Sequence, residues 1–268
     1  MSTKPYPKAR KRFGQNFLTD QSVIDDIVAA IDPHPGQHIV EIGPGRAAIT
    51  LPLLPNSDQL DVVELDRDLV PLLRAKLAAF SHLTIYEADA LSFDYRSLVK
   101  NDEKLRVIGN LPYNITTPLL FHLLEQADSI EDMCFMLQRE VVERICAAPG
   151  GKQYGRLSIM VQYQCQAEML FIVPPEAFEP VPKVESAIIY LRPLGEFVGG
   201  EVCLKSLGEL VTKAFSQRRK TIANTLKNMV SKEMLIAEGI ELEQRPETIS
   251  VTQYVSLTRA WLKSKSDK

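Results

Sequence analysis

Four residues near the middle of the chain, Asn110-Leu111-Pro112-Tyr113, combine groups that could hold a planar ring carrying an amino group. The Asn side-chain oxygen accepts hydrogen bonds, Pro keeps the neighbouring carbonyls in one direction, and Tyr offers a flat face for stacking. They follow the apolar run at 105–109, and ligands bind at the carboxyl ends of strands in open α/β sheets. An ordinary strand-to-helix turn accounts for Asn and Pro equally well, so the tetrapeptide alone leaves both interpretations open.

A second candidate site is the sequence Gly43-Pro44-Gly45, between a predicted strand at 38–42 and a predicted short helix at about 46–54. Glycine lets the backbone approach a ligand closely, and the helix would point its N-terminus at that ligand. Glu64 ends the next predicted strand, where a carboxylate can bind both hydroxyls of a ribose. These features alone fit NAD as well as any other adenosine cofactor.

Three further residues favour S-adenosylmethionine over a dinucleotide. Glu41 precedes the glycines and would repel a pyrophosphate, whereas it suits a cationic methyl donor. Asp89 ends the third predicted strand, where it could meet an adenine amino group, and Asn110 ends the fourth, beside the expected sulfonium. An NAD-dependent oxidoreductase remains the alternative if the glycine loop is taken alone.

The candidate site residues lie in a segment where predicted strands and helices alternate. Apolar residues at helical spacing predict a helix that starts after an Asp20 N-cap and stops at Asp32-Pro33. The alternation of strands and helices predicts an α/β fold with a doubly wound, Rossmann-like parallel sheet. The strands are expected at 38–42, 59–65, 83–87, 105–109, 132–137, 168–173 and 186–192.

A Gly-containing stretch at 195–200 predicts a domain boundary. Residues 1–195 would form the cofactor domain, with a basic N-terminal arm at 1–20. Residues 196–268 show only helical patterning and would form a small all-helical C-terminal domain.

Composition excludes several classes of protein. Hydrophobic content of 45% and charged content of 24% are ordinary for a soluble globular chain, with no apolar run of about 18 residues and no secretory signal. The four cysteines are scattered without CxxC spacing, and His34 and His38 lack further ligand candidates nearby. We therefore expect a cytoplasmic, reduced, metal-free protein without a membrane partner.

Basic residues are concentrated in two places although the net charge is −3. Residues 201–268 carry 12 Lys and Arg against 8 Asp and Glu. Such patches favour contact with nucleic-acid phosphates, and solvated surface is the alternative. The predicted RNA-binding residues are Lys8, Arg10, Lys11, Arg12, Arg218, Arg219 and Lys220.

Almost from end to end, the chain resembles the ribosomal RNA adenine N6,N6-dimethyltransferases, and within them the bacterial small-subunit (16S) enzymes. One departure is Ala47, where many relatives carry a third glycine. The matching segments are 11–18, Glu41-Ile42-Gly43-Pro44-Gly45, Glu64-Leu65-Asp66, Asp89-Ala90, 109–114, 154–158, 178–184 and the basic helix segment 214–221.

The resemblance implies a class I methyltransferase fold and transfer of methyl groups from S-adenosylmethionine to N6 of two adjacent adenines. These adenines lie in the hairpin loop near the 3′ end of 16S rRNA. It also implies action in small-subunit biogenesis on 16S rRNA or a pre-ribosomal particle, an RNA- or ribosome-binding helical domain, and a monomer. The implied cofactor contacts are Asn16, Leu18, Gly43, Glu64, Asp89 and Asn110.

The expected chemistry is orientation rather than strong base catalysis. The Asn110 oxygen and the Leu111 carbonyl would accept hydrogen bonds from adenine N6, so that its lone pair points at the methyl group. Tyr113 would stack on one face of the adenine and Phe178 on the other, with a core position as the alternative for Phe178.

Rival functions are separable by experiment. A DNA adenine methyltransferase shares the Asn-x-Pro-aromatic arrangement. A 23S rRNA adenine methyltransferase of the antibiotic-resistance type is a closer alternative, which the long match in the C-terminal segment disfavours. A non-catalytic assembly factor would bind RNA without methyl transfer. RNA C5-cytosine methylation is disfavoured because the chain contains no Pro-Cys sequence.

Overall fold

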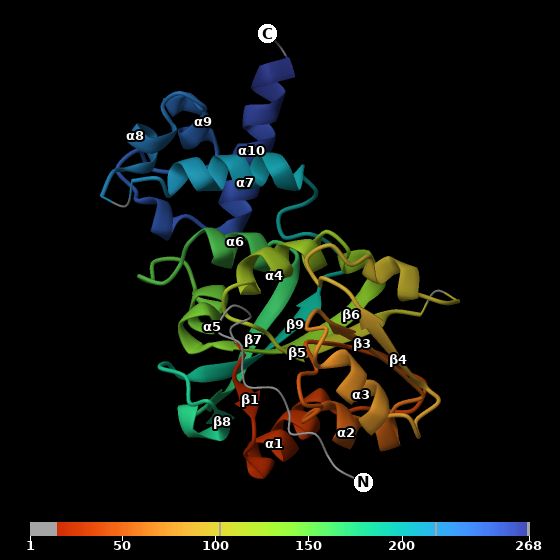
Figure 1. The fold of residues 1–268 in the computed structure, drawn as a ribbon. Helices are drawn as coiled ribbons and strands as arrows, with labels where there is room; N and C mark the ends of the chain where they lie inside the picture. The colour runs from red at the N-terminus through yellow and green to blue at the C-terminus, as the bar shows by residue number, and fades with distance from the viewer. Residues whose placement is uncertain (1–14, 102, 218, 267–268) are drawn as a thin grey trace. The chain divides into compact units, whose positions relative to one another are not determined.

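A computed structural model of the protein describes residues 15–101, 103–217 and 219–266 (Figure 1). The predicted RNA-binding residues Lys8, Arg10, Lys11, Arg12 and Arg218 lie outside the described residues.

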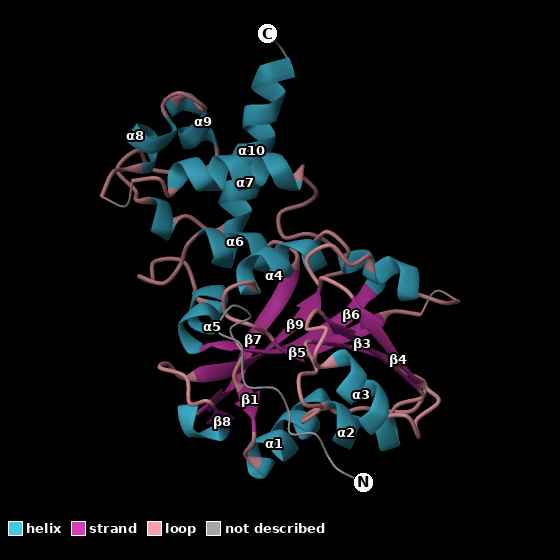
Figure 2. Ribbon diagram, viewed as in Figure 1, coloured by secondary structure: helices cyan, strands magenta, loops and turns pink. Residues whose placement is uncertain are grey.

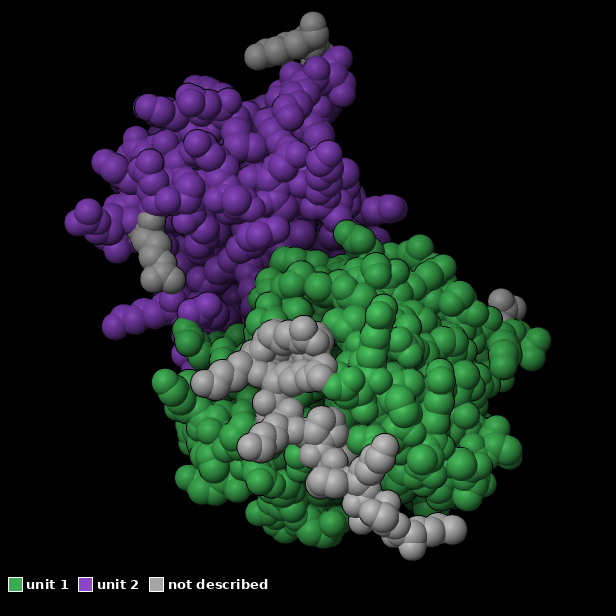
Figure 3. Space-filling model, viewed as in Figure 1, with its two compact units in different colours: residues 1–142, 168–193 green, residues 143–167, 194–268 purple. Residues whose placement is uncertain are grey.

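The chain forms two compact units, residues 1–142 with 168–193 and residues 143–167 with 194–268 (Figure 3). This division differs from the expected boundary at 195 because residues 143–167 group with the C-terminal helices. Within that second unit, Gln162 Nε2 donates to the Ala147 carbonyl (2.9 Å), and the Val202 N–H donates to Tyr163 Oη (2.9 Å).

The first unit is built on a seven-stranded sheet of order β4-β3-β2-β5-β6-β9-β7. Its strands are β2 (His38–Ile42), β3 (Gln59–Glu64), β4 (Leu83–Glu87), β5 (Leu105–Asn110), β6 (Ile130–Gln138), β7 (Cys165–Val173) and β9 (Ser186–Pro193). The start of β7, up to residue 167, is grouped with the second unit. From β4 to β6 neighbouring strands pair in parallel, as the alternating pattern predicts. However, β9 is antiparallel to β6, so the sheet is mixed and departs at this strand from the parallel sheet that the pattern predicts, whereas the predicted Rossmann-like α/β fold is confirmed.

A crossover helix is missing where the sheet changes direction. Between β7 and β9 lie only the short 3-10 turn η5 (Pro175–Ala177) and β8 (Phe178–Glu179), and a parallel connection normally needs a helix. β8 pairs instead with β1 (Phe17–Leu18) in a separate antiparallel ribbon.

Helices α1 (Gln21–Ile31), α2 (Thr50–Leu53) and α3 (Val70–Lys76) contribute apolar residues to one core with β2 and β3. Asp20 is the N-cap of α1, as predicted, and Asp32 ends it in the left-handed conformation. The helix expected from Arg46 begins only at Thr50, because Ala47 has a φ of +64° that an α-helix does not allow. The remaining elements of this unit are η2 (Leu54–Asn56), η3 (Tyr95–Leu98), α4 (Thr116–Leu124) and η4 (Ala127–Ser129), with α5 (Arg139–Cys146) extending past Val142 into the second unit.

In the second unit, the described residues from 194 onward are drawn as helices and loops (Figure 2). Its elements are α6 (Arg156–Gln162), α7 (Leu204–Ala214), α8 (Ile222–Leu226), α9 (Lys232–Ala237), η6 (Pro246–Thr248) and α10 (Val251–Ser266). Across the described ranges, we find no helix with the length and apolarity to cross a membrane.

Candidate functional site

A cavity of about 340 Å³ opens where β2, β3, β4 and β5 end. Parallel strands bring their carboxyl ends to one edge, so residues distant in sequence meet there. The lining contains all the residues predicted to bind the cofactor and most of the catalytic set: Asn16, Leu18, Glu41, Gly43, Gly45, Glu64, Asp89, Asn110, Leu111, Pro112 and Tyr113.

Glu64 joins the glycine loop to the end of β3. Its Oε2 accepts from the Gly45 N–H (3.3 Å) and its Oε1 from the Asp66 N–H (2.8 Å). Gly43 has a φ of +68°, a conformation that favours glycine, and it brings the loop beside the Asn110 backbone carbonyl. The predicted glycine loop therefore exists, although turns rather than a helix follow it.

Glu41 is a buried acid on the cavity wall. Burial raises its pKa to about 7, the Thr50 hydroxyl lowers it, and the charge of Glu64 raises it. Its Oε2 has no hydrogen-bond partner among the residues that the structure describes. A cationic group in the cavity would favour the ionised form of this carboxyl and lower its pKa.

The turn after β5 is fixed by backbone contacts on both sides. The Leu111 N–H donates to the Met136 carbonyl (3.2 Å), and the Pro112 carbonyl accepts from the Ile115 N–H (3.1 Å). Asn110 Nδ2 donates to the Asn16 carbonyl (3.2 Å), which assigns the side-chain nitrogen to the protein and leaves Oδ1 as the acceptor.

Tyr113 is half-buried, and a residue of β9 contacts its hydroxyl. Its hydroxyl lies 2.7 Å from Oγ of Ser186, a fully buried residue. Burial raises the pKa of Tyr113, and the Ser186 bond lowers it. A neutral, anchored phenol ring suits stacking on a planar ligand.

One wall of the cavity comes from residues 15–18. Gln15 Nε2 donates to Asp66 Oδ2 (2.9 Å), and the Arg46 guanidinium lies over the Phe17 ring, 4.1 Å from its centroid. Gln15, Asp66 and Ser186 were not among the predicted site residues. Gln15 and Asp66 occur within the matching motifs, which was the available signal, whereas nothing in the sequence points from Ser186 to Tyr113.

Asp89 is an exposed residue of the cavity lining, in the loop after β4. Its Oδ1 accepts from the Leu91 N–H (2.9 Å). Leu65 and Leu91 also line the cavity, and Leu65 is 48% exposed. Apolar side chains beside an exposed acid form an arrangement that suits a flat, amino-bearing ring.

Phe178 occupies the core rather than the cavity wall. It is 2% exposed, packs in the same hydrophobic cluster as Leu18, and pairs with Leu18 across the β1–β8 ribbon. In this structure its ring offers no face for stacking, which agrees with the alternative given for it. Pro112 borders the cavity and is half-buried.

Arg219 and Lys220 are exposed between α7 and α8. The expectation that 214–221 is helical was wrong, because α7 ends at Ala214. An exposed turn still leaves both cations accessible to solvent.

The cavity residues fit S-adenosylmethionine by their chemistry. Glu41, Glu64 and Asp89 border a space next to glycine backbone, which suits a cationic adenosine derivative and opposes a pyrophosphate. The Glu41 carboxyl, whose Oε2 has no hydrogen-bond partner among the described residues, would complement the charge of a cationic ligand when ionised.

Comparison with known proteins identifies the family of the chain. The family described as "Ribosomal RNA adenine dimethylase" matches residues 6–264. The chain is 52% identical to "Ribosomal RNA small subunit methyltransferase A" of Nitrosococcus oceani, over 96% of this chain and 97% of that protein. It is 54% identical to the protein of the same name from Pseudomonas aeruginosa, over 93% of each.

Two solved structures share the fold. The 23S rRNA methyltransferase ErmE is 25% identical with a TM-score of 0.71, over 91% of this chain and 98% of that one. A dimethyladenosine transferase from Plasmodium falciparum is 23% identical with a TM-score of 0.76, over 93% and 98%.

Proposed function

Because the chain belongs to the ribosomal RNA adenine dimethylase family and is therefore an S-adenosylmethionine-dependent rRNA adenine dimethyltransferase, we propose that it acts on 16S rRNA. The target is N6 of two adjacent adenines in the hairpin loop near the 3′ end, during biogenesis of the small subunit. The names of its relatives, which place them at the small ribosomal subunit, support this substrate.

The observation that carries the site assignment is the position of Asn110. Asn110 lines the cavity together with Glu41, Glu64 and Asp89, and its Nδ2 donates to the Asn16 carbonyl. In this proposal Glu64 binds the ribose hydroxyls, Asp89 the adenine amino group of the donor, and Glu41 its cationic end. Asn16, Leu18, Gly43 and Gly45 complete the donor site.

When bound, S-adenosylmethionine supplies a methyl group on an electrophilic sulfonium. Asn110 Oδ1 accepts a hydrogen bond from the N6 amino group of the target adenine. The Pro112 carbonyl is committed to Ile115 and Thr116, which favours the Leu111 carbonyl as the second acceptor. Two acceptors orient the nitrogen lone pair toward the methyl group, so placement supplies most of the acceleration.

Tyr113 provides the stacking surface for the target adenine, which must leave its stack to enter the cavity. Its bond to Ser186 fixes the ring plane before RNA arrives. Phe178 supports this arrangement from the core by holding β8 against β1, beside Asn16.

The second unit binds RNA or the ribosome in this proposal. Arg219 and Lys220, together with Lys8, Arg10, Lys11, Arg12 and Arg218 outside the described residues, supply cations for RNA phosphates. The protein acts as a cytoplasmic monomer, and light scattering of the purified chain measures its oligomeric state.

A labelled-methyl assay on small subunits that lack the modification tests the function. We expect label on two adjacent adenines of the 16S hairpin loop. Naked 16S rRNA, 23S rRNA and duplex DNA serve as competing substrates. Label on 23S rRNA or DNA instead of the 16S loop would falsify the proposed substrate.

A further inference from the structure

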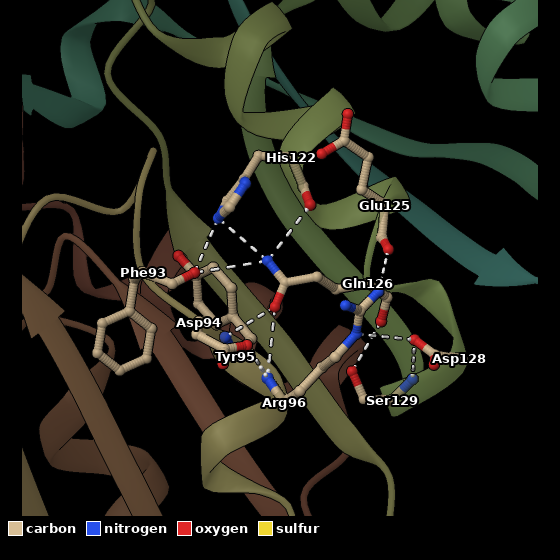
Figure 4. Close-up of polar contacts among 9 residues, drawn as sticks. All are labelled: Phe93, Asp94, Tyr95, Arg96, His122, Glu125, Gln126, Asp128 and Ser129. Carbon is tan, nitrogen blue, oxygen red and sulfur yellow. Dashed lines mark hydrogen bonds and ion pairs between the residues drawn. The ribbon is translucent and has the colours of Figure 1, made fainter. Parts of the chain in front are cut away.

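Two side chains that follow the Asn110–Tyr113 turn in the sequence contact the backbone of the loop that carries Asp89. His122 lies on α4, and Gln126 follows that helix. Figure 4 shows both side chains pointing toward the backbone of residues 93–96. His122 Nε2 lies 2.8 Å from the Phe93 carbonyl oxygen and 3.0 Å from Gln126 Nε2, so the ring contacts both the loop backbone and the Gln126 amide.

Gln126 uses both ends of its amide on the same segment. It is 5% exposed, and its Oε1 accepts from the Tyr95 N–H (2.8 Å) and the Arg96 N–H (3.3 Å). Its Nε2 donates to the Phe93 carbonyl (3.4 Å). A buried amide that lost these partners would leave several polar groups unsatisfied, so the contact is strongly held.

Tyr95 carries this support on to the Asp89 loop. Its ring is fully buried, and its hydroxyl donates to the carbonyl of Ala90, the residue after Asp89 (3.2 Å). The rings of Phe93 and Tyr95 pack edge to face, 5.1 Å apart. A continuous path of contacts therefore runs from α4 through Gln126 and Tyr95 to the neighbour of Asp89.

We propose that Gln126, together with His122, is a positioning residue that places the Asp89 carboxylate opposite the 6-amino group of the methyl donor's adenine. Asp89 is itself exposed, and the bond from the Leu91 N–H to its carboxylate is local. The loop is anchored before Asp89 by the bond from the Ala88 N–H to the Glu64 carbonyl (3.1 Å), and after Asp89 by the contacts of Gln126 and His122 with residues 93–96. A small displacement of that carboxylate is enough to weaken a directional hydrogen bond. This inference rests on the role proposed above for Asp89.

The test measures recognition of the amino group rather than overall activity. Calorimetry gives the dissociation constants of S-adenosylhomocysteine and of S-inosylhomocysteine, which carries a carbonyl oxygen in place of the amino group. We expect the wild-type protein to prefer the adenosyl compound by at least about tenfold, the lower end of the effect of a hydrogen bond to a charged group. In Gln126→Met the preference falls to about twofold or less, and amide hydrogen exchange at 89–96 becomes faster.

Tyr95→Phe and Arg96→Ala complete the design. Tyr95→Phe loses only the hydroxyl bond to Ala90, so its preference falls partway. Arg96→Ala is the matched control: it removes side-chain contacts to Asp128 and Glu125 in the same cluster but keeps the backbone N–H that binds Gln126. Its preference stays at the wild-type ratio.

The outcomes separate this inference from the role of Asp89. A Gln126→Met protein with the wild-type ratio overturns the inference and leaves Asp89 in place. A wild-type protein without any preference overturns the role of Asp89 and the inference with it. If Gln126→Met does not fold, Tyr95→Phe decides the matter, and an unchanged ratio in that variant contradicts the inference.

Discussion

The side-chain Nδ2 of Asn110 donates a 3.2 Å hydrogen bond to the backbone carbonyl of Asn16. This bond joins the end of β5 to the N-terminal wall of the cavity and fixes the orientation of the Asn110 amide. The Asn110 oxygen that remains is the acceptor that the proposed chemistry needs, so Asn16 in the cavity wall orients the residue proposed to be catalytic.

Replacement of Asn110 tests that geometry. We expect Asn110→Ala to lower kcat for methyl transfer by about 10²–10³-fold, the effect of removing a preorganised polar group at a reacting centre. Asn110→Asp keeps an acceptor oxygen but loses the donor to Asn16, so its kcat falls as well. Labelled-methyl incorporation gives the rates, and thermal melting checks that both variants fold. Near-normal turnover in Asn110→Ala would sink the proposed role.

Glu41 makes stability depend on pH. Its pKa rises from 4.5 to about 7 on folding, so the folded protein holds a proton that the unfolded chain releases. Below pH 4.5 Glu41 is protonated in both states and does not lower the free energy of unfolding. As the pH rises from 4.5 toward about 7, only the unfolded chain ionises this group, so the free energy of unfolding falls. We expect Glu41→Gln to gain stability relative to wild type across that interval, measured as the free energy of unfolding in urea. Exposed Glu196→Gln is the control, and a parallel profile for both variants contradicts the prediction.

Gly109 in β5 lies against the backbone of Ile42 in β2. A Cβ at this position, directly before the Asn110–Tyr113 turn, would collide with the Ile42 backbone carbonyl oxygen. We expect Gly109→Ala to lower the free energy of unfolding by about 1–3 kcal/mol, as overpacking does, and to reduce methyl transfer. Gly195→Ala is the matched control, because nothing lies within 4 Å of the added Cβ there. Equal free energies of unfolding for the two variants would contradict the prediction, because they would show that β2 and β5 accommodate the added Cβ without loss of stability.

The exposed cations between α7 and α8 are expected to contact RNA phosphates. Neutralising Arg219 and Lys220 together should reduce the slope of log binding constant against log salt by about 1.5, since each phosphate contact contributes roughly 0.7–0.9. Filter binding of 16S rRNA at several salt concentrations measures the slope. Neutralising the exposed residues Lys205 and Lys232 together controls for the change in net charge. An unchanged slope after neutralising Arg219 and Lys220 would show that these two side chains do not contact RNA phosphates.

Local sequence patterns predicted much of this protein. The strand that ends at Asn110, the glycine turn at Gly43 and the acids Glu41, Glu64 and Asp89 follow from short-range signals. Parallel strands then bring those strand ends to one edge, so local patterns and the rules of sheet topology together predict the candidate site.

Only the tertiary structure placed the groups whose partners are distant in the sequence. The Asn16–Asn110 and Tyr113–Ser186 bonds, the burial of Phe178 and the antiparallel direction of β9 each depend on how separate segments pack. Ala47 similarly shortened a helix through its backbone conformation. Local periodicity is enough to predict which chemical groups lie at the strand ends, because it depends only on neighbouring residues. Packing decided how each group is oriented, because orientation comes from contacts between segments that no local pattern encodes.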